Sequence, residues 1–234
     1  MIDVSSILEK GEIVVTGRLI DASNATLLAD CLFEDSKIKC IYKPVAGERP
    51  LWDFPDGNLA NREYAAFLIS ELLGFNIVPL TILREGPFGI GMVQEWIEID
   101  ENVDLGKFFS TDHPELRKMA LFDAVINNTD RKIGHLLPRK DGAIFGCDHG
   151  VTFHHEYKLR TVLWQWADEE LSSIELQNLN TLLTKIKSGE NAVIQTLLTD
   201  IEIAALIHRI QDLIKYRKFP LPSPDWPAIP WPAF

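Results

Sequence analysis

The order of strand-like and helix-like segments constrains the fold of this chain more than any other feature. In roughly the first hundred residues, short segments rich in apolar and β-branched side chains alternate with turn residues such as DASN and EDSK, which is typical of β-strands. A helix is expected at about 59–73, with Asp56 or Asn58 as its N-cap and Gly74 as its C-cap. Strands are predicted at 12–20, 25–33, 37–43, 77–83 and 89–99, the first three as an antiparallel meander.

From about residue 100 the pattern changes to helices. Residues 114–128 carry apolar side chains at near-helical spacing, so this segment should be a helix that is buried along one face. Two short strands are predicted at 135–139 and 143–148, three amphipathic helices within 170–189, 191–200 and 201–219, and an extended proline-rich tail at 220–234. A β-rich lobe (1–97) followed by a helical lobe (98–234) predicts an α+β fold with a site in the cleft between the lobes.

The net charge of −11 limits the classes of partner. Nucleic-acid affinity is built from clustered Lys and Arg, so we expect no nucleic-acid partner, and attraction to an anionic membrane surface is weakened as well. No stretch approaches the roughly 20 apolar residues of a membrane span, and the N-terminal MIDVSSILEKGE lacks the features of a signal peptide. A cytoplasmic globular protein without an integral membrane segment is therefore expected. Cys31, Cys40 and Cys147 lie in apolar strand-like runs and are expected to be core residues rather than ligands.

Two acidic residues stand out from their surroundings. Asp130 follows a predicted helix in NNTDRKIGHLL, and Asp148 stands alone in the apolar run GAIFGCDHGVTF. Asp130 could be an ordinary turn residue. Asp148 resists that explanation, because a buried carboxylate without a compensating partner is costly.

Four residues in order along the chain match the demands of phosphoryl transfer. Lys43 ends a strand, Glu63 lies in a helix, Asp130 lies in a loop and Asp148 precedes Gly150. Each alone has a plain structural explanation as a surface, helix or turn residue. Together they supply a lysine for the phosphates, a glutamate that holds it, an acid beside the attacking hydroxyl and an acid for the metal. A divalent cation would then compensate Asp148.

Several longer motifs resemble one known family. They are IYKP (41–44), REYAAFLISELLGFNIVPLT (62–81), VQEWIE (93–98), NNTDRKIGHLL (127–137), GCDHG (146–150) and WQWADEELS (164–172). In this order they resemble the phosphatidylinositol 3- and 4-kinase-like superfamily, in particular its plant type II-like gamma branch and small bacterial relatives. The resemblance covers roughly residues 12–175 and implies a two-lobed protein-kinase-like fold.

The resemblance also implies roles for single residues. Lys43 would contact the α- and β-phosphates of ATP, and Glu63 would orient it. Asp130 would be the catalytic acid/base, Arg131 would brace its loop, and Asp148 would hold Mg or Mn.

The nucleotide would be held by two further groups of residues in the same resemblance. Backbone groups near Gln94 and Glu95 would bind the adenine. The turn DASNAT (21–26) falls where a phosphate-covering loop belongs, and because it lacks glycine, Ser23, Asn24 and Thr26 would supply the hydrogen-bond donors.

His135 departs from the family pattern, which usually has an asparagine that shares the metal. A neutral imidazole is a poor ligand for magnesium and a better one for manganese. His135 is therefore either a metal ligand that changes the metal preference or a residue that only hydrogen-bonds the loop. His154 and His155 lack a nearby partner at zinc-ligand spacing, which argues against a zinc site.

The sequence thus predicts an ATP-dependent phosphotransferase whose partners are a nucleotide and an unknown phosphate acceptor. A lipid, a protein and a small-molecule hydroxyl all remain open as acceptors, with only Lys158 and Arg160 available after the metal site to read a phosphorylated headgroup. Transfer of AMP in place of phosphate also stays open. The alternative is a non-catalytic nucleotide-binding pseudokinase, which His135 and the glycine-free turn favour. The tail is expected to pack on its own domain through Trp226 and Trp231 rather than to serve as a partner-binding peptide.

Overall fold

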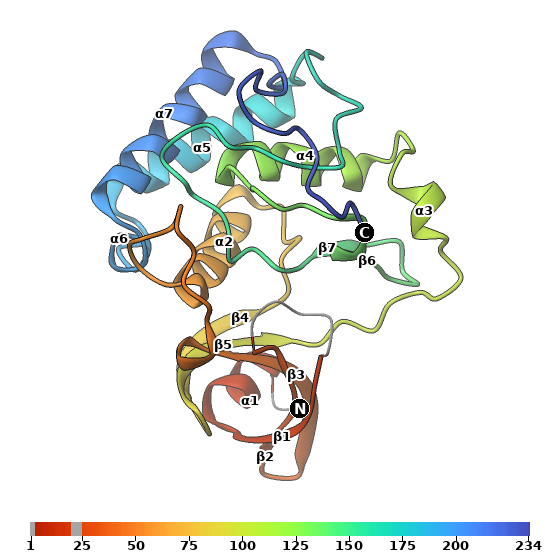
Figure 1. Ribbon diagram of the computed structural model, residues 1–234, viewed down its shortest axis with the longest axis vertical. Coiled ribbons are helices and arrows are strands. Elements are labelled where there is room, and N and C mark those ends of the chain that lie inside the picture. The colour runs from red at the N-terminus through yellow and green to blue at the C-terminus, as the bar shows by residue number, and fades with distance from the viewer. Residues whose placement is uncertain (1–2, 20–24) are drawn as a thin grey trace.

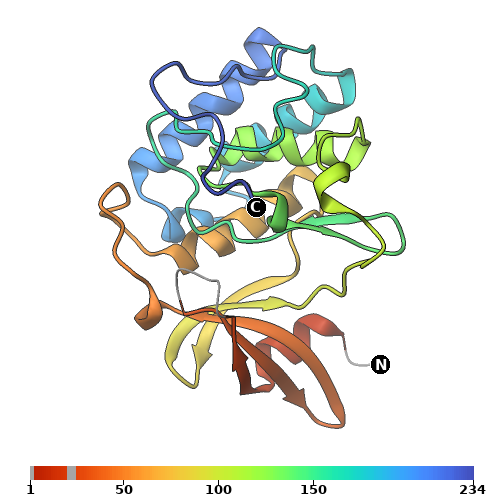
Figure 2. The same ribbon diagram turned by 45° about the vertical axis from the view of Figure 1, so that its right-hand side comes forward.

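The computed structural model describes residues 3–19 and 25–234, which form two lobes (Figures 1 and 2). The smaller lobe holds a five-stranded antiparallel sheet in the order β1-β2-β3-β5-β4. Its elements are α1 (Val4–Lys10), β1 (Glu12–Arg18), β2 (Leu27–Phe33), β3 (Ser36–Pro44), the short 3₁₀ turn η1 (Val45–Gly47), β4 (Thr81–Gly86) and β5 (Gly89–Glu95). The predicted α+β fold and the meander of the first three strands are confirmed.

The sheet lobe differs from the prediction in one additional helix and in the end of its last strand. Helix α1 was not expected; Asp3 caps it by accepting a hydrogen bond from the Ser6 amide at 2.7 Å, and Ile7 and Leu8 carry it into the small core of this lobe. The last strand, β5, ends at Glu95 instead of continuing to residue 99. Of the three cysteines, Cys31 and Cys40 are fully buried in this core, as expected, and Cys147 lies partly buried elsewhere.

Helix α2 (Leu59–Leu73) connects the sheet to the helical lobe. Asn58 caps its start by accepting the Asn61 amide at 2.7 Å, and Gly74 ends it in the left-handed conformation with φ of 70°, as the sequence predicts. The buried side of α2 belongs to the large core that the C-terminal helices form. The predicted lobe boundary at residue 97 stays a prediction.

The larger lobe is built mainly from helices (Figure 1). Its elements are α3 (Leu105–Phe108), α4 (Pro114–Ile126), η2 (Ile133–His135), β6 (Leu136–Pro138), β7 (Ile144–Gly146), α5 (Ser173–Ser188), α6 (Ile194–Leu197) and α7 (Asp200–Tyr216). Ser172 and Thr199 start α5 and α7 with capping boxes that Glu175 and Glu202 complete. The helix predicted at 191–200 is only the single turn α6. No helix in the described ranges is both long and apolar enough to cross a membrane.

The tail after α7 has no regular structure and runs back across the helical lobe toward β6 and β7 (Figures 1 and 2). The carbonyl of Ala228 accepts the Thr161 amide at 3.0 Å, and the carbonyl of Ala233 accepts the Ile133 amide at 2.9 Å. The tail therefore packs on its own domain, as expected. One detail was wrong: the side chain of Trp231 does not take part, because 93% of it is exposed.

Candidate active site

The cleft between the lobes brings Lys43, Glu63 and Asp148 together. Lys43 lies at the end of β3, and its Nζ is 2.6 Å from Glu63 Oε1 on α2 and 2.7 Å from Asp148 Oδ1 in the loop after β7. The other carboxylate oxygen of Glu63 accepts the amide of His149 at 2.9 Å. The sheet, the connecting helix and the helical lobe each contribute one charged group to this cluster.

Burial and opposite charge act against each other in this cluster. Burial alone would lower the pKa of Lys43, but Asp148 and Glu63 outweigh it and raise that pKa well above its ordinary value. The charge of Lys43 holds the pKa of Asp148 well below its usual range. For Glu63, burial outweighs the lysine and raises the carboxyl pKa. Asp148 is the open member of the cluster, with 51% of its side chain exposed against 2% for Glu63.

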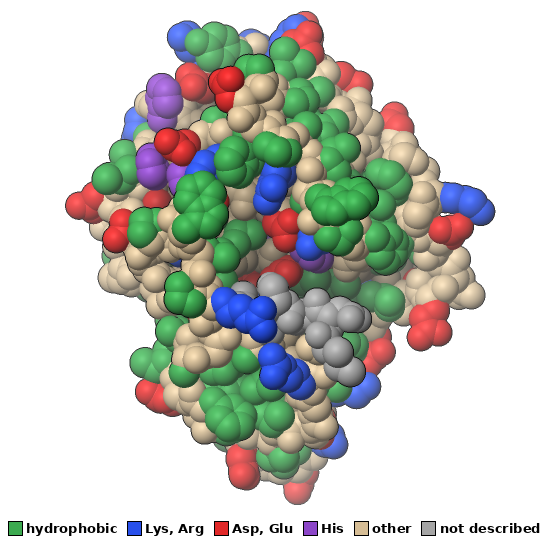
Figure 3. Space-filling view, in the orientation of Figure 1, with side chains coloured by type: hydrophobic (Ala, Val, Ile, Leu, Met, Phe, Trp, Pro, Cys, Tyr) green, Lys and Arg blue, Asp and Glu red, His purple; other side chains and the backbone are tan. Residues whose placement is uncertain are grey.

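Asp130 shares a cavity with Asp148. Both line a cleft of about 490 Å³, and the hollow that Lys43 and Glu63 line adjoins it through Asp148. The Asp130 carboxylate lies 3.4 Å from Lys132 Nζ, and its backbone amide donates to Asn128 Oδ1 at 3.0 Å. Burial raises the pKa of Asp130, while Lys132 opposes that rise. In Figure 3 acidic side chains lie at the bottom of the hollow between the lobes, with apolar and basic ones around it.

The loop that carries Asp130 is tied down from within by Arg131. Its guanidinium is fully buried and bonds both oxygens of Asp123 on α4, at 2.9 to 3.2 Å. It also donates to the carbonyl of Cys147 at 3.1 Å and lies 2.7 Å from His149 Nε2. One side chain therefore joins α4, the Asp130 loop and the Asp148 loop, which fixes the two acids relative to each other.

His135 faces Asp148 but presents the wrong nitrogen for a metal. The Lys132 amide donates to His135 Nδ1 at 3.4 Å, so the proton of the neutral ring lies on Nε2, which is 3.5 Å from Asp148 Oδ2. Burial lowers the pKa of His135 to about 4, so the ring is neutral near pH 7. A metal ligand must offer an unprotonated nitrogen. The contacts favour a histidine that steadies the loop and donates toward Asp148.

The available donors suit a magnesium or manganese ion that is held partly by substrate phosphates. They do not suit an ion that is held by protein side chains alone. No group of three or more His, Cys, Asp or Glu side chains in residues 3–19 and 25–234 could hold a metal ion. Magnesium commonly binds through one or two carboxylates together with substrate phosphates and water. Asp148, half exposed and facing the cleft, fits that pattern.

The expected adenine-binding residues lie in a paired strand. Gln94 is buried and its side-chain amide donates to Thr81 Oγ1 at 2.8 Å, while the Glu95 amide donates to the carbonyl of Leu80 at 2.9 Å. The amide of Trp96 donates to the carbonyl of Lys39 at 3.2 Å, whereas the next two amides, of Ile97 and Glu98, have no backbone hydrogen-bond partner among the described residues. The contacts with adenine at Gln94 and Glu95 stay a prediction.

The expected phosphate-covering turn lies largely outside the described residues. Ser23 and Asn24 fall in the gap at 20–24. Thr26 is buried, and its carbonyl accepts the Leu19 amide at 3.0 Å, which closes the base of this turn. The structure thus places only the base of the turn.

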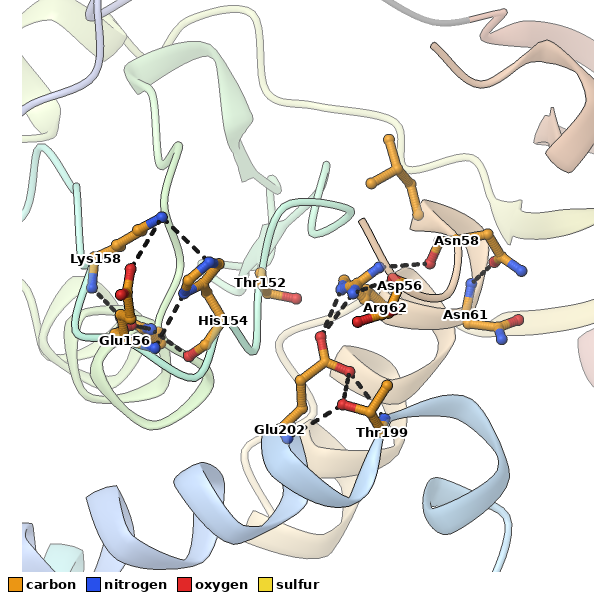
Figure 4. Close-up of polar contacts among 12 residues, drawn as sticks. Asp56, Asn58, Asn61, Arg62, Thr152, His154, Glu156, Lys158, Thr199 and Glu202 are labelled. Carbon is orange, nitrogen blue, oxygen red and sulfur yellow. Dashed lines mark hydrogen bonds and ion pairs between the residues drawn. The ribbon is translucent and has the colours of Figure 1, made fainter. Parts of the chain in front are cut away.

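Several supporting residues are not evident from the sequence. Arg62 on α2 forms a buried ion pair with Glu202 on α7, with Nη2 2.6 Å from Oε1, and it also donates to the carbonyls of Asp56 and Asn58 (Figure 4). No local pattern reveals a pair so far apart in sequence. Asp123 was detectable, because an acid on the apolar face of a predicted helix signals a buried partner.

The histidines considered for zinc have other contacts. His154 Nε2 lies 3.2 Å from Lys158 Nζ (Figure 4), and the His154 ring stacks on His155 with centroids 4.5 Å apart. Lys158 itself is buried, with its Nζ 3.4 Å from Glu156 Oε2. A headgroup could therefore not reach Lys158 as easily as the sequence suggests.

Comparisons with known proteins agree with a kinase-like fold. Models of known protein families give no match. The solved structure of hydra Fam20 with sugar superposes with a TM-score of 0.55 at 15% identity over 91% of this chain and 87% of that one. The Golgi casein kinase superposes with a TM-score of 0.56 at 13% identity over 92% and 75%, and its form with Mn/ADP bound gives 0.56 at 13% over 90% and 74%. These identities establish the fold alone.

One curated relative is much more similar in sequence. Protein Rv2133c of Mycobacterium tuberculosis (strain ATCC 25618 / H37Rv) is 40% identical over an alignment of 267 positions, which spans 99% of this chain and 96% of that protein. Such identity over nearly the whole of both chains shows common descent. The chain belongs to the family of Protein Rv2133c, with an α+β fold of the atypical protein-kinase type.

Proposed function

We propose that this protein is an ATP-dependent phosphotransferase, an atypical kinase related to the phosphatidylinositol 3- and 4-kinase-like superfamily that its motifs resemble. One observation carries the proposal: Lys43 bridges Glu63 and Asp148 across the cleft, while Asp130 lines the same cleft beside Asp148. Phosphoryl transfer needs a cation for the phosphates, an acid for the metal and an acid for the acceptor hydroxyl within one site. The arrangement supplies all three.

Each residue then has a defined task. Lys43, held by Glu63, binds the phosphates of ATP, and Asp148 would hold a divalent cation that neutralises charge on those phosphates. The acceptor oxygen bonds to the γ-phosphorus as the bond from that phosphorus to the β,γ-bridging oxygen breaks. ADP leaves with that electron pair, and the hydroxyl proton passes to Asp130. The raised pKa of Asp130 suits a proton acceptor, because an acid/base works best when its pKa lies nearer the working pH.

The adenine is proposed to lie against the segment that follows β5. The family resemblance assigns the adenine contacts to Gln94 and Glu95 at this strand end, and the free amides of Ile97 and Glu98 nearby support the proposal, since they have no backbone hydrogen-bond partner among the described residues. A nucleobase can accept hydrogen bonds from such amides without disturbing the sheet.

A non-catalytic nucleotide switch is the second candidate, and His135 favours it. The ring donates toward Asp148 rather than sharing a metal with it, so Asp148 would be the one protein ligand assigned to the cation. A site with fewer ligands could bind nucleotide and still transfer phosphate poorly.

The test separates binding from turnover. ATP with Mg or Mn should raise the melting temperature, because a ligand that binds only the native state stabilises it by mass action. Asp130→Asn should keep this shift and lose about 10² to 10⁴ in turnover, followed as ADP release and by product analysis that distinguishes phosphate from AMP transfer. Asp141→Asn, an exposed acid in the turn between β6 and β7, serves as the control.

The outcomes lead to different conclusions. Absence of any shift at millimolar ATP with either metal contradicts nucleotide binding altogether. A shift without turnover in the unmodified protein supports the nucleotide switch instead.

A further inference from the structure

The half of the cleft beyond Asp130 has its own chemistry. Tryptophans from two distant segments line it: Trp52 from the loop before α2, and Trp226 and Trp231 from the tail. Basic side chains line the same cavity, among them Lys132 and Arg160. Neither set is required for binding the phosphates of ATP by Lys43 and Asp148.

Part of this wall is explained by packing. Lys158 Nζ lies 5.5 Å from the ring centroid of Trp52 and 4.9 Å from that of Trp226, so it joins the loop to the tail. The guanidinium carbon of Arg160 lies 5.5 Å from the Trp226 centroid. These contacts anchor the tail and give Trp226 a structural role.

Packing within the fold does not explain why a tryptophan stands at position 231. Its side chain is 93% exposed although it lines the cleft, and Trp52 on the opposite segment is 84% exposed. An indole with most of its surface in water contributes little apolar burial to the stability of the fold. Aromatic faces around a few placed polar groups are typical of small-molecule sites, and the whole cavity, with its Asp130 and Asp148 end included, has a volume of about 490 Å³, which is within their usual size.

The basic residues give the site its charge preference. Arg160 donates through Nε to the carbonyl of Thr129 at 2.7 Å, and no carboxylate of the described residues forms an ion pair with it. Lys132 lies 3.4 Å from the Asp130 carboxylate, at the boundary between this half of the cleft and the reacting end. Arg49, Lys132 and Arg160 line the cavity together with the acids Asp53, Asp130 and Asp148, so its formal charges balance and an anion would be bound by Arg160 and Lys132 themselves rather than by a net positive charge. Guanidinium groups bind phosphate and carboxylate oxygens well.

We propose, resting on the phosphotransferase function above, that the acceptor is a small anionic molecule with a hydroxyl group on a ring, as in a soluble phosphorylated sugar. The ring lies against Trp231, the anionic group faces Arg160 and Lys132, and a ring hydroxyl points toward Asp130. The hydroxyl oxygen receives the γ-phosphoryl group, its proton passes to Asp130, and ADP is released. The product carries one phosphate more than the acceptor.

The first experiment compares charged and neutral rings on the full chain with saturating ATP and manganese. The probes are glucose 6-phosphate and ribose 5-phosphate, each matched with glucose or ribose, with ADP release and mass spectrometry as readouts. At least one phosphorylated probe should raise ADP release and gain a phosphate, with the neutral partner at least tenfold less effective. Equal effects of charged and neutral rings overturn the proposal.

The second experiment tests the aromatic wall. Trp231→Ala should raise the KM for the phosphorylated probe about tenfold and leave the affinity for ATP unchanged, and Trp231→Phe should restore most of the loss. Phe88→Ala removes another exposed aromatic, in the turn between β4 and β5, and should change neither value. Unchanged acceptor KM in Trp231→Ala overturns the assignment.

Two further probes separate this inference from the proposed function. Phosphatidylinositol vesicles and a serine-containing peptide are offered under the same conditions. Phosphorylation of either in preference to the sugar phosphates overturns the acceptor class and leaves the phosphotransferase intact. ATP-dependent stabilisation with no response to any sugar phosphate also overturns the acceptor class, whereas absence of ATP binding contradicts the function itself.

Discussion

Two clusters at the candidate site each pair a basic side chain with acidic ones, and the two clusters differ in their access to water. Arg131 and Asp123 are both 0% exposed, and every contact of the pair lies inside the helical lobe. In the other cluster exposure rises stepwise, from 2% for Glu63 through 18% for Lys43 to 51% for Asp148. Ion pairing between acidic and basic side chains thus occurs near the site both in a sealed form, buried from water, and in an open form that water reaches.

The difference in exposure indicates that the buried pair keeps its partners, whereas Asp148 can exchange Lys43 for another cation. A buried pair stays together because either charge without its partner would be left in a poorly solvating interior. A half-exposed carboxylate such as Asp148 can turn from Lys43 to another cation at little cost, since water and a metal ion can both replace the lysine. We infer that the sealed pair sets the shape of the site and the open one takes part in binding.

Breaking the sealed pair should have the largest effect. Arg131→Met leaves the Asp123 carboxylate buried with only Asn128 and Thr161 as hydrogen-bond donors, so the free energy of unfolding should fall by about 3–5 kcal/mol in urea titrations. Lys37→Met, which breaks the pair between an exposed lysine and the partly buried Asp30, should cost about 1 kcal/mol or less. Similar losses in both variants would show that burial does not distinguish the pairs.

The second buried ion pair, Arg62 with Glu202, tests whether the loss of any buried ion pair weakens ATP binding. Arg62→Met should lower the free energy of unfolding by about 3 kcal/mol, because Glu202 keeps its charge at the start of α7 without its partner. This pair joins α2 to α7 and does not touch the Asp130 loop. The ATP affinity of the folded variant, measured by calorimetry well below its melting temperature, should match that of the parent. A large loss of affinity would mean that α2 needs this anchor to hold Glu63.

Removing the charge of the open cluster should affect binding more than stability. Asp148→Asn should weaken ATP binding in the presence of metal at least tenfold, about 1.4 kcal/mol, because the anionic ligand for the cation is lost. The free energy of unfolding should change by about 1 kcal/mol or less, since half of the side chain is in water. A loss of stability as large as in Arg131→Met would place Asp148 with the sealed group.

The smallest effect is expected at His135. If the ring only donates toward Asp148, His135→Asn should change ATP affinity less than about threefold, under roughly 0.7 kcal/mol, and leave the preference between Mg and Mn as it was. Calorimetric titrations with each metal measure this directly. A switch of preference from Mn to Mg in the variant would instead identify His135 as a ligand.

The sequence predicts the order of elements well because periodicity and caps are local signals. Asn58 and Gly74 mark both ends of α2, and the strands before it are rich in apolar and β-branched residues. Short elements escape such signals: α1 has seven residues, and α6 keeps only one turn of the helix expected there. Helices of this length depend on packing rather than on propensity.

In the candidate site, too, some residues have a local sequence signal and others do not. Lys43, Glu63, Asp130 and Asp148 are identifiable because they occur in ordered motifs, and the structure brings them to one cleft. No local sequence pattern predicts the pairings between segments that are distant in sequence. The partners of Arg131 and the exposure of Trp231 follow from packing, so only the three-dimensional structure reveals them.

The hydrogen bond from Ile133 to Ala233 also has a consequence for how the chain is made. The loop that carries Asp130 is synthesised before its partner in the tail, because Ile133 precedes Ala233 in the chain. A contact between residues so distant in sequence forms slowly, since a long loop must close first. A nascent chain in which helix α7 has already formed would therefore still lack this contact of its candidate catalytic loop until the residues around Ala233 have emerged as well.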